Sequence, residues 1–142
     1  MPRPEIAHGF LPFEIRPQLL AKGKTTTHLP RTDLLSAQIQ VVASGGETNL
    51  HAHRGEDAFW LILNGRARFY TTNDELVGEY GKHEGLVISR GMPYWFESAS
   101  DEALVVARVT ARAQNEEAGR VDFEARKTAV QNDVAKIDAV LG

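Results

Sequence analysis

The chain of 142 residues carries 16 basic and 19 acidic residues and has a formal net charge of −3. This length predicts a single domain over residues 1–142, and 42% hydrophobic with 25% charged residues is ordinary for a globular protein. The charge gives no electrostatic reason to expect nucleic acid or an anionic membrane as a partner. The absence of cysteine excludes disulfides, thiolate metal ligands and cysteine nucleophiles.

Residues 1–32 are expected to form an extended arm. They contain five of the six prolines and end in "AKGKTTTHLPRT", which has no clear periodicity. Arms of this kind commonly lie along a neighbouring subunit. The start, "MPRPEIAHGFLPFEIRP", lacks the apolar core of a signal peptide, and no run approaches membrane-spanning length. A cytoplasmic location is therefore expected.

The sequence pattern of residues 33–112 is typical of β-strands throughout. Apolar and alternating runs follow one another as "LSAQIQVVA", "AFWLILNGRARFY", "EGLVISRGMPYWFES" and "EALVVARVTAR". Turn signals such as "SGGE", "RGED", "TTNDE" and "SASDE" separate them. Several short strands at this spacing predict an all-β sandwich or barrel.

Residues 113–142 are expected to be a helical segment. Val130, Val134, Ile137 and Leu141 recur every three or four positions and would share one helix face. Asp122 is a plausible N-cap of this helix. We expect the helix to cover the barrel or a partner subunit.

The stretch "NLHAHRGEDAFWLILNG", residues 49–65, contains the main candidate functional residues. His51 and His53 are one residue apart, so on a strand both imidazoles point to the same face. Two neutral imidazoles on one face suit a transition metal or a proton-transfer site.

This stretch resembles the first motif of the cupins: a glycine, five residues, His-x-His, a glutamate after three or four residues, and a closing glycine. Gly45, His51, His53 and Gly65 fall on that spacing. The second motif is matched at its core by "EGLVISRGMPYWFE", with Gly91 as the turn glycine. The resemblance covers roughly residues 33–112 and implies a double-stranded β-helix barrel.

Two of the four metal ligands that the resemblance implies are replaced. Ala58 stands where the cupin glutamate would be, and Tyr94 stands where the final histidine would be. A site with fewer protein ligands remains: a divalent zinc, iron, nickel or manganese ion on His51 and His53, with Asp57 or Tyr94 as oxygen ligands. Whether Asp57, Glu56 or neither replaces the missing glutamate is left open, because Asp57 could lie in a turn where strand parity does not apply.

Three further residues are candidate ligand contacts. Trp60 and Phe96 could form an aromatic pocket wall with Tyr94, or could be plain core. Arg68 continues the parity of Ala58 and Trp60, so it could hold a carboxylate or phosphate near the barrel mouth. Solvation at a strand end is the ordinary alternative for such an arginine.

Three functions remain open. The first is a metal-dependent enzyme that acts on a small oxygen-rich substrate. The second is a metal-free isomerase or epimerase with His53 or His51 as base and Tyr94 as acid, since the His-Ala-His stretch is similar to that of small cupin ketoisomerases acting on thymidine-diphosphate sugars. The third is a non-catalytic small-molecule binding module.

A homodimer is also expected. Every residue of the run "FWLIL" is apolar, so a strand formed by it would have two apolar faces, and both would have to be buried. The Pro-rich arm could contribute to a subunit interface.

Overall fold

The computed structural model describes residues 3–18, 23–43, 48–113, 120–123 and 135–136, and these are almost entirely β-structure and irregular chain. The first half of the fold contains β1 (Lys24–His28), β2 (Leu35–Val42), β3 (His51–His53), β4 (Glu56–Asn64) and β5 (Ala67–Tyr70). A single 3₁₀ turn, η1 (Thr72–Asp74), precedes β6 (Leu76–Tyr80), β7 (Gly85–Ile88), β8 (Trp95–Ser98), β9 (Leu104–Arg112), β10 (Arg120–Asp122) and β11 (Ala135–Lys136).

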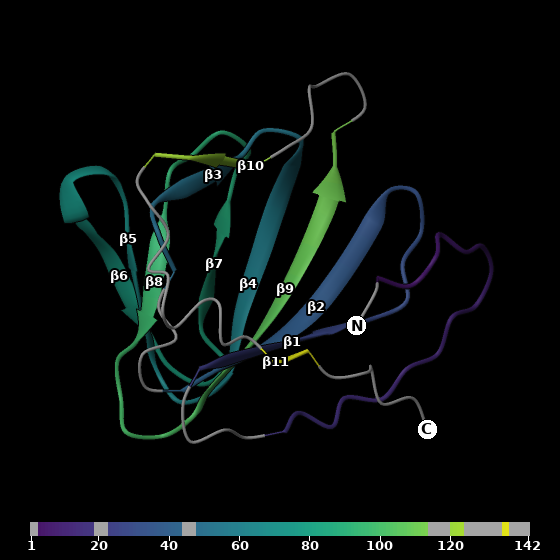
Figure 1. The fold of residues 1–142 in the computed structure, drawn as a ribbon, viewed down its shortest axis with the longest axis horizontal. Helices are drawn as coiled ribbons and strands as arrows, with labels where there is room; N and C mark the ends of the chain where they lie inside the picture. The colour runs from purple at the N-terminus through teal and green to yellow at the C-terminus, as the bar shows by residue number, and fades with distance from the viewer. Residues whose placement is uncertain (1–2, 19–22, 44–47, 114–119, 124–134, 137–142) are drawn as a thin grey trace.

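The strands form a large sheet that faces two small ones (Figure 1). The large sheet has the order β11-β1-β2-β9-β4-β7, and the small sheets are β6-β5-β8 and β10-β3. Within the large sheet the pairs β1–β2, β2–β9, β9–β4 and β4–β7 are antiparallel, and β11 pairs with β1 in parallel. Neighbours such as β2 and β9 are far apart in sequence, which is the crossed-over pairing of a jelly-roll-like barrel.

The core fills the space between the sheets. On β4, Ala58, Trp60 and Ile62 alternate with more exposed residues, so one face of the strand is buried. Aromatic rings from the small sheet meet this face: the rings of Trp60 and Phe69 lie 5.4 Å apart, and those of Phe69 and Phe96 lie 5.1 Å apart. The cluster consists of Val42, Ala58, Trp60, Ile62, Ala67, Phe69, Tyr94, Phe96, Leu104 and Val106. The interior of the barrel is therefore packed with side chains.

Gly65 ends β4 and redirects the chain into the small sheet. Its φ of +77° is a left-handed conformation that favours glycine, and a Cβ there would lie 2.8 Å from the carbonyl oxygen of Ala103. The turn breaks the alternation that runs along β4. Ala67 and Phe69 are the buried residues of β5, and Arg68 between them is exposed.

The ends of the chain differ from the sequence-based expectation. Within residues 1–32, Lys24–His28 is β1 of the large sheet rather than part of an irregular arm. The helix predicted within residues 113–142 is not seen: its described parts are the strands β10 and β11, and its apolar positions Val130, Val134, Ile137 and Leu141 lie outside the described residues. The predicted N-cap, Asp122, instead pairs with His51 in the β10–β3 ladder and is therefore a strand residue.

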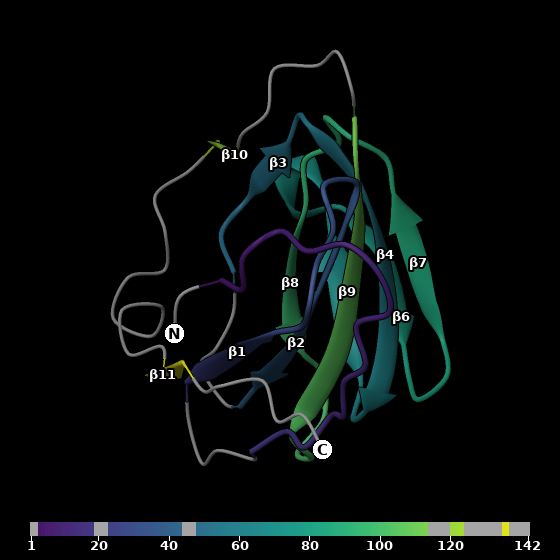
Figure 2. The same ribbon diagram turned by 90° about the vertical axis from the view of Figure 1, so that its right-hand side faces the viewer.

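The remaining arm runs across the large sheet (Figure 2). It is tied down near Arg31, because Ile6 and Arg31 form a parallel bridge and the Ala7 amide donates to the Arg31 carbonyl at 3.0 Å. Among the described residues, none of the helical structure is long and apolar enough to span a membrane.

Candidate functional site

The histidine pair lies on β3, a three-residue strand at one end of the barrel (Figure 1). The rings of His51 and His53 are 5.2 Å apart and nearly perpendicular. Their proximity is as expected for alternate residues of one strand. His51 is 3% exposed, and its Nδ1–H donates to the Asn49 carbonyl at 2.5 Å, which leaves Nε2 as an acceptor. Gly45, which the first cupin motif places before this pair, lies outside the described residues.

Both imidazoles are neutral at neutral pH. Burial lowers the pKa of His51 to about 3, against the opposing effect of its hydrogen bond to Asn49. Burial also lowers the pKa of His53 to about 4, and the positive charge of Arg108 adds to this effect. Neutral imidazole can coordinate a metal or accept a hydrogen bond, but a pKa near 4 makes a weak base at pH 7.

Glu56 is the carboxylate that the structure brings to His53. It is the first residue of β4 and shares a face with Ala58 and Trp60. Its Oε1 lies 3.5 Å from His53 Nδ1 and accepts a hydrogen bond from Arg108 Nη2 at 2.7 Å. Burial alone would raise the pKa of Glu56, but the charge and hydrogen bond of Arg108 outweigh it and lower the pKa.

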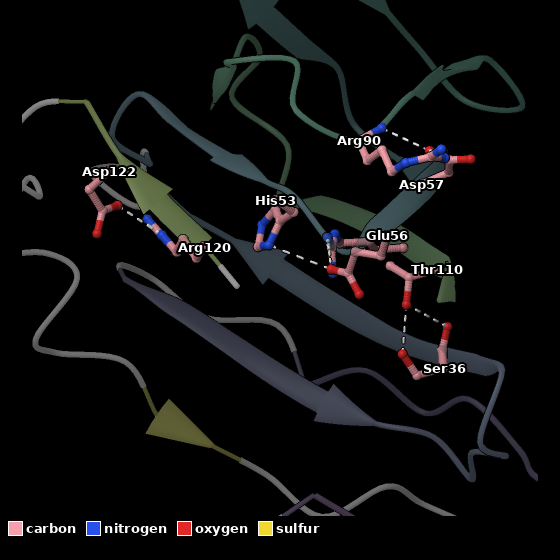
Figure 3. A network of polar contacts seen from close by, with 9 residues as sticks. Ser36, His53, Glu56, Asp57, Arg90, Thr110, Arg120 and Asp122 are labelled. Carbon is pink, nitrogen blue, oxygen red and sulfur yellow. Dashed lines mark hydrogen bonds and ion pairs between the residues drawn. The ribbon is translucent and has the colours of Figure 1, made fainter. Parts of the chain in front are cut away.

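Asp57 lies apart from the histidine pair. Because β4 already begins at Glu56, strand parity does apply, and the Asp57 side chain points away from the barrel interior. Its carboxylate is 45% exposed, accepts a hydrogen bond from the Arg90 amide at 2.8 Å, and lies 3.7 Å from the Arg90 guanidinium. Figure 3 shows this pair well separated from His53 and Glu56.

Tyr94 does come close to the histidines. It exchanges two backbone hydrogen bonds with His51, of 2.8 and 3.0 Å, and the two rings are 4.4 Å apart. Burial raises the pKa of the Tyr94 phenol, against the effect of the nearby Arg108. Tyr94 also lines a small cavity of about 10 Å³ together with His53, Glu56 and Arg108.

The other three predicted contacts do not line this cavity. Trp60 and Phe96 are 2% and 1% exposed and pack in the core, their rings 5.2 Å apart. Neither residue lines any of the three cavities that reach His53. Arg68 lies on the outer face of β5 and pairs with Glu79 at 2.7 Å. The turn at Gly65 explains why Arg68 does not follow the inward parity of Trp60.

Arg108 is a site residue that the sequence analysis did not identify. It lies on β9 opposite Trp60, with its guanidinium 5.5 Å from the centre of the indole ring. Its Nε is buried and has no hydrogen-bond partner among the described residues. The alternation of "LVVARVTAR" could have identified Arg108 as an inward-facing residue, because Leu104, Val106 and Arg108 share the inward face of the strand.

A cleft opens from this site at the barrel mouth. Two cavities of about 260 and 300 Å³ both reach His53 and Glu56. They also share Ser36 and Thr110, whose hydroxyls are 2.6 Å apart (Figure 3). The small cavity beside Tyr94 adjoins the inner end of this cleft, since His53 and Glu56 line it as well. The arrangement presents hydrogen-bond donors and acceptors around a space for a small molecule.

The donor set fits a divalent metal poorly. Two imidazoles and one carboxylate are present, but Glu56 is already bound by the cationic guanidinium of Arg108. A second cation beside the same carboxylate would meet charge repulsion. No group of three histidine, aspartate or glutamate side chains suited to a metal occurs within the described residues.

No known protein-family profile and no curated protein matches this sequence. Solved structures do match. An uncharacterized Klebsiella pneumoniae protein with a double-stranded β-helix domain has 16% identity and a TM-score of 0.64, over 78% of this chain and 86% of that one. The cupin domain of Schizosaccharomyces pombe Cnp3 has 17% identity and a TM-score of 0.56, over 61% and 63%.

Bacillus subtilis oxalate decarboxylase, a protein with Mn(II) centres, has 17% identity and a TM-score of 0.53, over 65% of this chain but only 24% of its own. These likenesses define the fold of the chain. It is the cupin fold, a double-stranded β-helix, as the two sequence motifs predict.

Proposed function

We propose that this cupin binds a small oxygen-rich molecule at the mouth of its barrel, held by protein groups rather than by a metal ion. The observation that carries the proposal is the Arg108–Glu56 pair beside His53, at the inner end of the cleft. Guanidinium, carboxylate and neutral imidazole together offer both donors and acceptors to hydroxyl and carbonyl groups. Arg108 supplies there the positive charge that a metal ion would supply in a metal-dependent cupin.

The cavity sizes support a particular placement of such a ligand. The space beside Tyr94 is about 10 Å³, which is room for one hydroxyl- or carbonyl-sized group. The outer cavities of about 260 and 300 Å³ are near the lower end of the range for small-molecule sites. A ligand would thus place one oxygen next to His53 and Tyr94 and keep its bulk in the mouth, above the packed aromatic core.

A metal-free isomerase is less well supported than binding. It needs a base near its operating pH, and the pKa values of about 3 and 4 for His51 and His53 are too low for efficient proton abstraction at pH 7. The Tyr94 phenol, with its raised pKa, would be a weak acid. Proton transfer by this pair therefore ranks behind binding.

A divalent metal on His51 and His53 is the second candidate, and one observation favours it. The Asn49 carbonyl fixes the Nδ1–H tautomer of His51, so its Nε2 lone pair is available as metal-binding histidines require. Zinc, iron, nickel and manganese all suit imidazole with oxygen ligands. To complete such a site, Glu56 would have to break its ion pair with Arg108, or bind the metal and Arg108 at the same time.

The assembly that we propose is a homodimer. The outer face of the large sheet exposes apolar side chains, among them Leu35, Phe59 and Val87, at 50%, 48% and 67%. Phe59 and Val87 are direct partners across β4 and β7, so they form a continuous apolar surface. A second copy of the chain would bury it.

A cytoplasmic location also stays a prediction.

The binding proposal is tested with ¹⁵N-labelled protein and small polyhydroxy compounds. We expect the amide signals of residues 53–57 and the Trp60 indole signal to shift in the wild type. Glu56→Gln should weaken these shifts severalfold, because it removes the charged acceptor at the inner end of the cleft. Asp57→Asn is the matched control and should leave them unchanged, since Asp57 points outward. Equal effects of the two variants would place the site elsewhere.

A further inference from the structure

Three arginines from separate parts of the chain converge on the outer part of the cleft. Arg3 comes from the N-terminal arm, Arg31 from the connection between β1 and β2, and Arg112 from the end of β9. All three line the cavity of about 260 Å³ that has His53 and Glu56 on its inner side. We call these three residues the mouth arginines.

The carboxylates of the cleft do not balance this charge. Two acidic residues line the same cavity, Glu56 and Asp33. Glu56 is engaged by Arg108, which leaves one carboxylate, Asp33, to face three guanidinium groups. In the described part of the chain, the side chains of Arg3 and Arg112 take part in no ion pair.

Contacts with the backbone hold the N-terminal arm, and with it Arg3, beside Arg31. Arg31 Nε donates to the Pro4 carbonyl at 2.7 Å, and the bridge between Ile6 and Arg31 fixes the arm beside the cleft. Burial and the charge of Arg31 lower the pKa of Arg3 against the opposing charge of Glu56, and Arg108 and Arg112 add smaller lowering contributions. Like charges around one cavity repel, and a bound anion would offset the repulsion.

This cationic cleft stands on a chain whose net charge is −3. Its charge is therefore a local feature, and clefts lined by one sign of charge concentrate ligands of the opposite sign. Guanidinium groups bind carboxylate and phosphate oxygens in a bidentate manner, which gives direction as well as charge.

We propose that the ligand of this cleft carries an acidic group, a carboxylate or a phosphate, and that Arg3, Arg31 and Arg112 hold it. The inference rests on the proposed function, because the same ligand would place a hydroxyl or carbonyl oxygen beside His53 and Glu56. It adds the class of ligand: a small hydroxy acid or sugar-like acid rather than a neutral polyol. It also makes the N-terminal arm, through Arg3, a wall of the site.

Three matched probes test the inference: glycerol, glycerate and glycerol 3-phosphate, which share a three-carbon hydroxylated skeleton and differ in the acidic group. Dissociation constants come from ¹⁵N chemical-shift titrations. We expect at least one acidic probe to bind the wild type about tenfold or more tightly than glycerol, since charge-assisted hydrogen bonds are the strong ones. Comparison of glycerate with the phosphate shows which acid the cleft prefers.

Arg3→Gln and Arg112→Gln should each reduce that preference severalfold, and the double variant should bring the acidic probes to within about twofold of glycerol. Both side chains are exposed, so neither change should unfold the protein. Arg68→Gln is the control: it removes an exposed arginine from β5, away from the cleft, and should leave the preference intact.

The outcomes separate the two proposals. If the acidic probes bind no better than glycerol, or if Arg68→Gln weakens them as much as Arg3→Gln does, the mouth arginines are not an acid site. Signals at His53 and Glu56 that still respond to glycerol would then leave the binding proposal standing. If none of the three probes shifts those signals at tens of millimolar, both proposals fail.

Discussion

Replacing Arg108 with glutamine removes the cation on which the proposed site depends. Arg108 Nη2 lies 2.7 Å from Glu56 Oε1, and the two side chains are 10% and 26% exposed. Removal of one partner from a fully buried pair costs about 3–5 kcal/mol, because the other charge stays buried and unpaired. Glu56 is a quarter exposed, so water screens part of this loss and we expect about 2–3 kcal/mol.

The assay is urea unfolding at pH 7, with a double-variant cycle as the internal test. Arg108→Gln combined with Glu56→Gln removes both charges, so we expect the double variant to be more stable than Arg108→Gln alone by about 1 kcal/mol or more. Arg90→Gln breaks the exposed pair with Asp57 and serves as the control, with an expected loss below about 1 kcal/mol.

Arg108→Gln should also change the titration of His53. The charge of Arg108 contributes to the low pKa of His53, about 4, so its removal should raise that pKa toward the ordinary value, which NMR of the imidazole can follow. Arg108→Gln with a stability loss below about 0.5 kcal/mol and an unchanged His53 pKa would show that Arg108 does not act on Glu56 and His53 as described.

Three further predictions concern pH, packing and assembly. The pKa values of His51 and His53 are lowered in the folded state to about 3 and 4, so the unfolded chain binds more protons below about pH 6.5. Their contribution to stability should therefore be complete above that pH and be lost as the pH drops from about 6.5 toward 3, with a shallower slope after both are replaced by glutamine. Phe69→Ala should cost about 3–5 kcal/mol in urea unfolding because Phe69 is fully buried, whereas Phe59→Ala, at a position 48% exposed, should cost below about 1 kcal/mol. Light scattering at tens of micromolar should give twice the monomer mass of 15.7 kDa, and a monomer would contradict the proposed dimer.

The barrel could be predicted because local pattern and motif spacing agree. His-x-His, the two turn glycines Gly65 and Gly91 and the alternating runs all indicate a cupin barrel, and the structure confirms that architecture. The strand at residues 120–122, where the helix was expected to begin, could not be predicted from periodicity, because its partner is β3, about 70 positions earlier in the chain. Pairing between distant segments leaves no trace in the local pattern.

The site was predicted in part. The histidine pair and Tyr94 follow from the motifs, and the structure brings them together. The choice between Glu56 and Asp57 depended on where β4 begins, which strand signals locate only to within a few residues. Arg68 was placed by a parity that the Gly65 turn interrupts. Arg108 and the mouth arginines join the site through the sheet order and the arm, which no local pattern specifies.

The central claim is that protein charge, not a resident metal, holds the ligand of this site, and elemental analysis tests it most directly. The protein should be purified without a nickel column from cells supplied with zinc, manganese, iron and nickel. We expect far less than one metal ion per chain in the wild type, and more in Arg108→Met, where Glu56 is released beside His53. Close to one metal ion per chain in the wild type, lost in both His51→Ala and His53→Ala, would contradict the account and establish the metal site.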